Sequence, residues 1–186
     1  MPCRKWTTRR PGWQVHAEAT AVSRVVIADA GPLIALSQAG QLSLLKGLFG
    51  SVALTEQIRA KVLDAGTFPG QEAIREALNA GWLRSQDVDL STWQPRRPGV
   101  DDGEASAIVL AQMHAAALLI IDDHAGRAEA TARGLAVMGV AAVVGLAKTQ
   151  GLLPRATPVL AQMRANGYFI GHGVVAAVLA RVGEAG

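Results

Sequence analysis

Val25-Val26-Ile27-Ala28-Asp29-Ala30-Gly31-Pro32 is the stretch of sequence that decides the fold. Its first four residues are β-branched or small and apolar, which predicts a buried strand that Asp29 ends. Pro32 then suits the first turn of a helix, where its missing N–H group costs nothing. A buried strand, a carboxylate and a helix in succession predict one unit of an α/β sheet, with Asp29 at the carboxyl end of the strand.

The same alternation of strand and helix continues along the chain. Short apolar runs predict further strands at 52–54, 82–88, 117–121 and 136–140. Periodic, glycine-bounded segments predict helices at 31–48 with a break near Gly40, and at 55–63, 71–80, 101–114, 123–133, 143–149, 159–165 and 174–182. This order is typical of a parallel, doubly wound α/β sheet flanked by helices and joined by right-handed crossovers.

The composition is that of one small domain with short extensions. The 186 residues are 50% apolar, which suffices for a sizeable core. We predict a flexible basic tail at 1–23, an α/β domain at 24–155, and closing helices at 156–186 that either pack on the domain or form a dimer interface. Trp6 and Trp13 leave a nucleic-acid-binding arm open as a second interpretation of the tail.

Charge and cysteine content restrict the surroundings in which the protein works. The net charge of +3 comes from the first 24 residues, which hold five basic residues and one acidic residue. The domain itself is therefore close to neutral, and its charge is weak support for nucleic-acid binding. Cys3 is the only cysteine, which excludes an intramolecular disulfide and fits a reducing cytoplasm. No apolar run in the sequence is long enough to span a membrane.

Acidic side chains gather where the expected strands end and the expected helices begin. They are Asp29, Asp122 and Asp123 after strands, and Asp101, Asp102, Glu104 and Glu56 at helix starts. In a parallel sheet these positions share one edge, where open α/β sheets bind ligands. Carboxylates about 4 Å apart repel by roughly 4 kcal/mol a pair, so their convergence requires protons or cations. Hard oxygen ligands favour Mg²⁺ or Mn²⁺, which activate water and neutralise charge on a phosphodiester.

Helix capping is the alternative interpretation of the same residues. Acidic side chains are favoured at helix N-termini by the helix dipole and the free amides. Asp101 and Glu104 have the spacing of a capping box, and Asp122 or Asp123 is suited to cap the helix that follows. Asp29 is harder to explain as a cap, because the first helix is expected to begin after it. Together, the acids at three separate ends favour a metal site.

Three segments resemble motifs of the PIN-domain superfamily. They are Val-Val-Ile-Ala-Asp29-Ala-Gly-Pro-Leu-Ile-Ala-Leu, Asp102-Gly-Glu104-Ala-Ser-Ala-Ile and Leu-Leu-Ile-Ile-Asp122-Asp123-His-Ala-Gly-Arg127. Their order and spacing are similar to an uncharacterised branch of predicted nucleic-acid-binding proteins related to VapC-type toxins, over roughly residues 24–170. The resemblance implies a PIN-like three-layer fold, RNA cleavage aided by Mg²⁺ or Mn²⁺, and pairing with a small antitoxin protein.

The resemblance also implies roles for individual acids. Asp29 corresponds to the first metal ligand, Glu104 with Asp102 nearby to the third acid, and Asp122 or Asp123 to the fourth. The second acid of the family is a glutamate, and Lys61 stands where that glutamate is expected. Glu56 is an imperfect substitute, because five residues place it about 140° away around a helix. A lysine that points into the acids would neutralise them and weaken metal binding.

The leading hypothesis is therefore a PIN-like endoribonuclease, in the manner of a toxin of a toxin–antitoxin pair. Asp29, Glu104, Asp122 and Asp123 would hold one or two Mg²⁺ or Mn²⁺ ions, and the apolar closing helices would support a homodimer. The alternative is a degenerate PIN fold that binds RNA or a protein without cutting, which Lys61 favours. A phosphotransfer receiver domain ranks third, because its acidic pair would follow the first strand, where only Asp29 is found.

Overall fold

A central parallel sheet organises the molecule. The computed structural model describes residues 24–64, 66–114 and 117–184, and the expected tail at 1–23 lies outside them. Within the described residues the sheet has five strands in the order β3-β2-β1-β4-β5, and every neighbouring pair is parallel. The strands are β1 (Val26–Ala28), β2 (Val52–Thr55), β3 (Leu83–Gln86), β4 (Leu118–Ile120) and β5 (Ala136–Met138). The predicted parallel α/β fold is confirmed.

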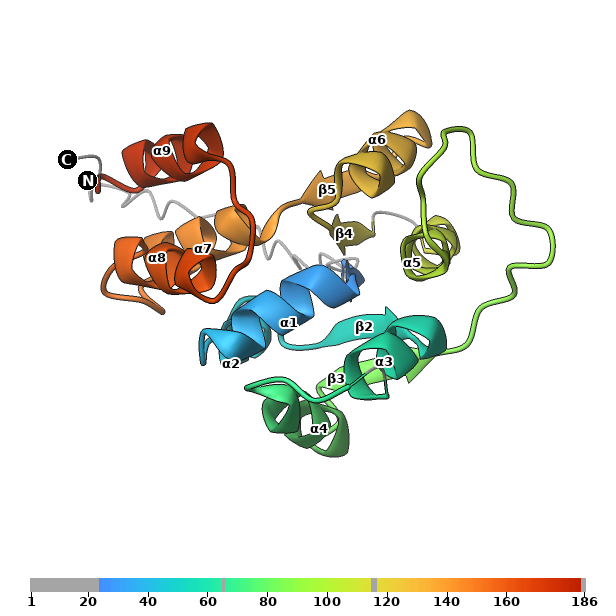
Figure 1. The fold of residues 1–186 in the computed structure, drawn as a ribbon, viewed down its shortest axis with the longest axis horizontal. Coiled ribbons are helices and arrows are strands. Elements are labelled where there is room, and N and C mark those ends of the chain that lie inside the picture. The colour runs from blue at the N-terminus through green and yellow to red at the C-terminus, as the bar shows by residue number, and fades with distance from the viewer. Residues whose placement is uncertain (1–23, 65, 115–116, 185–186) are drawn as a thin grey trace, which may run out of the picture.

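Helices cover both faces of this sheet. They are α1 (Ala30–Gln38), α2 (Ser43–Phe49), α3 (Glu56–Leu63), α4 (Gln71–Asn79), α5 (Asp102–Gln112), α6 (His124–Ala132), α7 (Val140–Thr149), α8 (Thr157–Ala165) and α9 (His172–Arg181). Figure 1 shows α1, α2, α7 and α8 on one side of the sheet, and α5 and α6 on the other. The three layers explain why the central strands read as continuous apolar runs, since parallel strands are buried on both faces.

The core lies along the three inner strands. Ile27, Leu54 and Leu119 are fully buried, whereas the residues of the edge strand β5 are only partly buried. The expected helix at 143–149 begins earlier than predicted, at Val140, and the strand before it ends at Met138. The reason is a hydrogen bond from the Val140 amide to a side chain distant in sequence, described below.

The C-terminal helices pack on the domain, and the last described residue ties the end of α9 to the start of α8. Helix α8 packs against α1 and α7, and α9 packs against α7. Glu184, which follows α9, accepts hydrogen bonds from the Ala156 amide at 2.7 Å, the Thr157 amide at 2.9 Å and the Thr157 hydroxyl at 2.6 Å. The bonds from Thr157 lower the pKa of Glu184 to about 2. A division of the chain at residue 155 stays a prediction.

Candidate active site at the carboxyl edge of the sheet

The strand order reverses between β1 and β4, and the acidic residues surround this point. Ala28 of β1 lies opposite Ile120 of β4, and the Asp29 amide donates to the Ile120 carbonyl at 2.9 Å. Asp29 therefore leaves β1 beside the end of β4, where Asp122 and Asp123 follow. Such a reversal opens a crevice at the carboxyl ends of the strands, which is the usual ligand-binding position of an open α/β sheet.

Asp29 is a buried carboxylate that lacks a full set of partners. Its side chain is 6% exposed, and among the described residues its buried Oδ1 atom has no hydrogen-bond partner. Asp29 precedes α1 in extended conformation but makes no side-chain capping bond to it. Burial raises the pKa of Asp29 above its usual value. A buried polar atom without a partner is costly, so Oδ1 marks a place where a ligand would be stabilised.

Glu104 belongs both to a helix cap and to the acidic cluster. At the start of α5, Asp101 accepts from the Glu104 amide at 2.8 Å, and the Glu104 carboxylate accepts from the Asp101 amide at 3.2 Å. The capping box expected as an alternative is thus present. Glu104 is nevertheless 5% exposed. Its burial, together with the nearby charges of Asp123, Asp101 and Asp29, raises the pKa of Glu104 to about 7.

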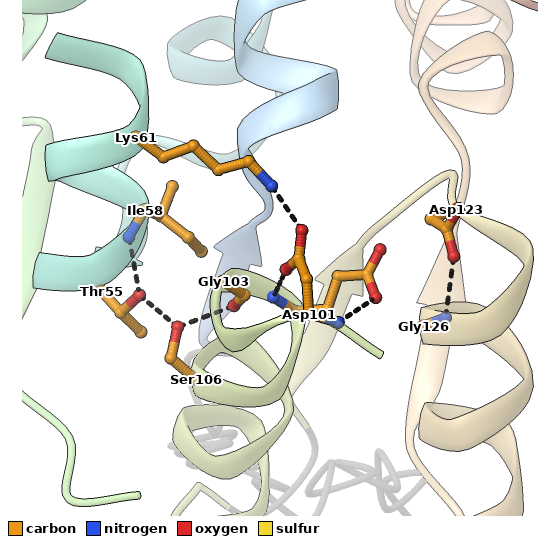
Figure 2. A network of polar contacts seen from close by, with 9 residues as sticks. Thr55, Ile58, Lys61, Asp101, Gly103, Ser106, Asp123 and Gly126 are labelled. Atoms are coloured by element: carbon orange, nitrogen blue, oxygen red, sulfur yellow. Dashed lines mark hydrogen bonds and ion pairs between the residues drawn. The ribbon is translucent and has the colours of Figure 1, made fainter. Parts of the chain in front are cut away.

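Asp123 caps α6 next to Glu104. Its Oδ1 accepts from the Ala125 amide at 2.7 Å and from the Gly126 amide at 3.2 Å. Gly126 allows the close approach of α6 to α5, because a Cβ atom there would lie 3.0 Å from the Glu104 carboxyl carbon and 2.5 Å from Ile121. Figure 2 shows Asp123 at the start of α6, with its carboxylate turned to the Gly126 amide.

Asp122 makes its hydrogen bonds at the start of α7 and not with the residues around Glu104. Both of its oxygens accept from the Val140 amide at 3.1 Å, and Oδ2 accepts from the Tyr168 hydroxyl at 2.8 Å. This contact begins α7 at Val140, three residues before the expected start. Gly139 makes room for it, because a Cβ atom there would lie 2.7 Å from Asp122. Of the two adjacent acids, Asp123 is therefore the one beside Glu104.

Lys61 reaches from α3 to the acidic cluster, as Figure 2 shows. Its Nζ atom lies 2.6 Å from Asp101 Oδ2, and both side chains are about half exposed. Burial lowers the pKa of Lys61, but Asp101, Asp29 and Glu104 outweigh it and raise that pKa above its usual value. An ammonium group thus stands where the resemblance expects a carboxylate. The two remaining candidates are peripheral: Glu56 pairs with Arg59 at 3.2 Å, and Asp102 is exposed.

A buried chain of hydroxyl groups holds α3 against α5. Ser106 donates to the Gly103 carbonyl at 2.7 Å, so the 2.6 Å contact between Ser106 and Thr55 is donated by Thr55. Thr55 in turn accepts from the Ile58 amide at 3.2 Å and caps α3. Figure 2 shows this chain beneath the contact of Lys61 with Asp101. The chain fixes the relative position of the two helices that carry Lys61, Asp101 and Glu104.

The carboxylate oxygens at this edge are of the type that binds Mg²⁺ or Mn²⁺, but they do not lie close enough together to bind one ion as they stand. Within 24–64, 66–114 and 117–184, no three His, Cys, Asp or Glu side chains lie close enough together to hold a metal ion. The carboxylates of Asp29, Glu104 and Asp123 are nevertheless hard oxygen donors from three elements. The Asp29 Oδ1 atom lacks a partner among the described residues, and burial together with neighbouring acids raises the pKa of Glu104. A divalent ion fits this chemistry.

Comparison with known proteins assigns the fold to a family. A family profile described as a PIN domain matches residues 25–184, most of the chain. The chain therefore belongs to the PIN-domain superfamily, whose fold is of the nuclease type and whose members generally use divalent metal ions. No curated protein and no solved structure matched the chain. In the described part of the chain, no helix is long and apolar enough to cross a bilayer.

Three parts of the site were not singled out from the sequence. Tyr168 ends the segment 163–168, which also resembles the family, but its contact with Asp122, 46 residues earlier, could not be predicted from the sequence. The Thr55–Ser106 contact joins residues 51 apart, and only the helix-capping position of Thr55 was expected. The sequence identifies Asp101 as an acid at a helix start. Its pairing with Lys61 could not be predicted, because it depends on how α3 and α5 pack.

Proposed function

We propose that this PIN domain is an endoribonuclease that hydrolyses RNA with the aid of Mg²⁺ or Mn²⁺. The proposal is supported by the electrostatic influence of Asp123 and Asp29 on Glu104 near the strand-order reversal, and by one Asp29 oxygen that is buried and has no partner among the described residues. The family's general use of divalent ions supports the same chemistry.

Each acidic residue has a distinct part in this proposal. An ion held by Asp29, Glu104 and Asp123 would activate a water molecule and neutralise charge that develops on the phosphodiester. Asp29 would contribute its buried, unpartnered oxygen, while Glu104 from α5 and Asp123 from α6 lie within electrostatic reach of each other. Lys61 offsets the charge of Asp101, so the remaining carboxylates are those available to a cation. Asp122, bound to Val140 and Tyr168, shapes the crevice from the side.

RNA cleavage by wild type and Asp29→Asn, with and without Mn²⁺, tests the proposal. Loss of an outer-shell partner of a metal ligand costs about 10–100-fold in activity. We therefore expect that loss of the ligand itself slows cleavage by more than about 100-fold. Asp64→Asn is the matched control, because Asp64 is an exposed carboxylate at the end of α3. Equal cleavage by wild type and Asp29→Asn removes the proposal.

The second candidate is a PIN fold that binds RNA or a protein and cuts weakly or not at all. Lys61 favours it, because an ammonium group 2.6 Å from Asp101 supplies part of the positive charge that a metal would bring. We also propose two further properties of this domain. One is a role as the toxin of a toxin–antitoxin pair, and the other is a homodimer formed through α9. Helix α9 supports the latter, since none of its residues is buried in the described chain. Light scattering measures the dimer directly.

A further inference from the structure

A basic pocket lies beside the acidic cluster, between α6 and the loop that precedes α5. Its volume is about 550 Å³. The residues that line it are Arg97, His124, Arg127, Ala128, Thr131 and Ala132. No carboxylate lines the pocket, although Asp123 directly precedes the lining residue His124. We propose that this pocket binds a backbone phosphate of the RNA strand, next to the phosphodiester at the acidic cluster. The inference rests on the proposed function, because it assigns a position to the same substrate.

The pocket begins one residue after Asp123 of the proposed active site. His124 directly follows Asp123, the cap of α6, and begins the helix that carries the pocket. On the opposite side, Gly99 of the loop lies against Ala125, since a Cβ atom at Gly99 would be 3.5 Å from the Ala125 methyl group. A strand whose scissile phosphate lies near Asp123 therefore passes Arg97 and His124 as it continues along α6.

The loop that carries Arg97 is fixed in place by a buried carboxylate. Glu129 of α6 is fully buried and accepts from the Arg96 amide at 3.0 and 3.1 Å. Arg133 donates to Glu129 at 2.6 Å and to the Gln94 carbonyl at 2.7 Å. It also lies 4.0 Å over the ring of Trp93. Burial opposes ionisation, but the bonds from Arg96 and Arg133 keep the pKa of Glu129 below its usual value. The backbone of the loop is thus held in place before any ligand binds, so less of it has to be ordered on binding.

The side chains of the pocket are ready to receive an anion. Among the described residues, the Arg97 guanidinium and the His124 ring have no hydrogen-bond partner, whereas Arg127 donates to the Ile121 carbonyl at 2.9 Å. A guanidinium presents planar paired donors that match phosphate oxygens. A phosphate is also the anion that the neighbouring reaction would bring. The pocket supplies sequence-independent contacts, because it holds the backbone and not the bases.

Binding of a labelled single-stranded RNA, measured without metal ions and in an Asp29→Asn background, separates this inference from the cleavage chemistry. We expect Arg97→Ala combined with His124→Ala to weaken binding about 5- to 10-fold. We also expect the slope of log K against log salt concentration to fall in magnitude by about 0.7 for one lost phosphate contact on a single strand. Arg84→Ala is the matched control, since Arg84 is an exposed arginine on β3 at the far side of the sheet.

The possible results are distinct. An unchanged affinity and slope for the Arg97→Ala, His124→Ala variant, with RNA still bound by the parent, overturns the pocket and leaves the proposed function in place. A loss as large for Arg84→Ala also overturns the pocket, because the contact would then be general to the surface. If the parent binds no RNA, the proposed function itself fails. Thermal melting of each variant checks that the exposed substitutions leave the fold intact.

Discussion

At the scale of single residues, the acids of this PIN domain serve the fold and the site together. Asp101, Glu104 and Asp123 cap helices and also stand within each other's electrostatic reach. Asp29 makes no capping bond to α1, and of the acids at this edge it is the one with a buried oxygen that has no partner among the described residues. The caps expected as the alternative interpretation are present for Asp101, Glu104 and Asp123. The role of Glu104 and Asp123 as metal ligands stays a prediction, which the caps do not exclude because a carboxylate has two oxygens.

Glu104 gives the site a measurable pH dependence without metal. Its pKa of about 7 lies above the ordinary value of 4.5, so the folded protein keeps a proton that the unfolded chain has lost between these pH values. Stability is fully present below about pH 4.5 and is lost as the pH rises through 7. We predict that Glu104→Gln is more stable than wild type at pH 8, by about 1–3 kcal/mol, and that the difference shrinks below pH 5. Thermal melting in chelator measures it.

Glu76→Gln provides the comparison for this experiment, because Glu76 is an exposed glutamate on α4. Its melting temperature is expected to follow that of wild type at every pH. A Glu104→Gln variant that is equally destabilised at pH 5 and pH 8 would mean that Glu104 carries no unfavourable charge. The cluster would then lack the repulsion from which a cation site is argued.

At the scale of elements, buried polar contacts between distant segments decide how the helices are set. Glu129 fixes the loop before α5, the Thr55–Ser106 pair joins α3 to α5, and Asp122 starts α7. Gly139 permits the Asp122 contact, and Gly126 permits the approach of α6 to Glu104, since a Cβ atom at either position would meet a carboxylate group at 3.0 Å or less.

The Glu129 contact is the clearest test at this scale. We predict that Glu129→Gln lowers stability by about 2–3 kcal/mol, because a buried acceptor of a charged donor is weakened and Arg133 loses its partner. The loop at 87–101 is expected to exchange its amide hydrogens faster, as measured by mass spectrometry. Glu56→Gln is the control, since it breaks an exposed ion pair with Arg59 that is worth less than about 1 kcal/mol. Equal melting of the two variants would contradict the role of Glu129.

At the scale of the whole molecule, more of the fold than of the candidate site could be predicted from the sequence. Short apolar strands and glycine-bounded helices are local signals, so β1 with α1 and β4 with α6 were correctly predicted. The sequence predicts the strand-end acids at one edge because topology alone brings strand ends together, and their action as one site stays a prediction. What could not be foreseen depends on packing across the chain, such as Tyr168 on Asp122, Lys61 on Asp101, and the fastening of the loop that carries Arg97.

Calorimetric titration with Mn²⁺ tests the central claim, that Asp29, Glu104 and Asp123 share a divalent cation. The account predicts that wild type binds Mn²⁺ and that Asp29→Asn binds it at least about 10-fold more weakly. Lys61→Glu is expected to bind more tightly than wild type, since it removes a competing ammonium group and adds a carboxylate oxygen. Identical titrations of wild type and Asp29→Asn, or no heat of binding from wild type and Lys61→Glu alike, would contradict the claim.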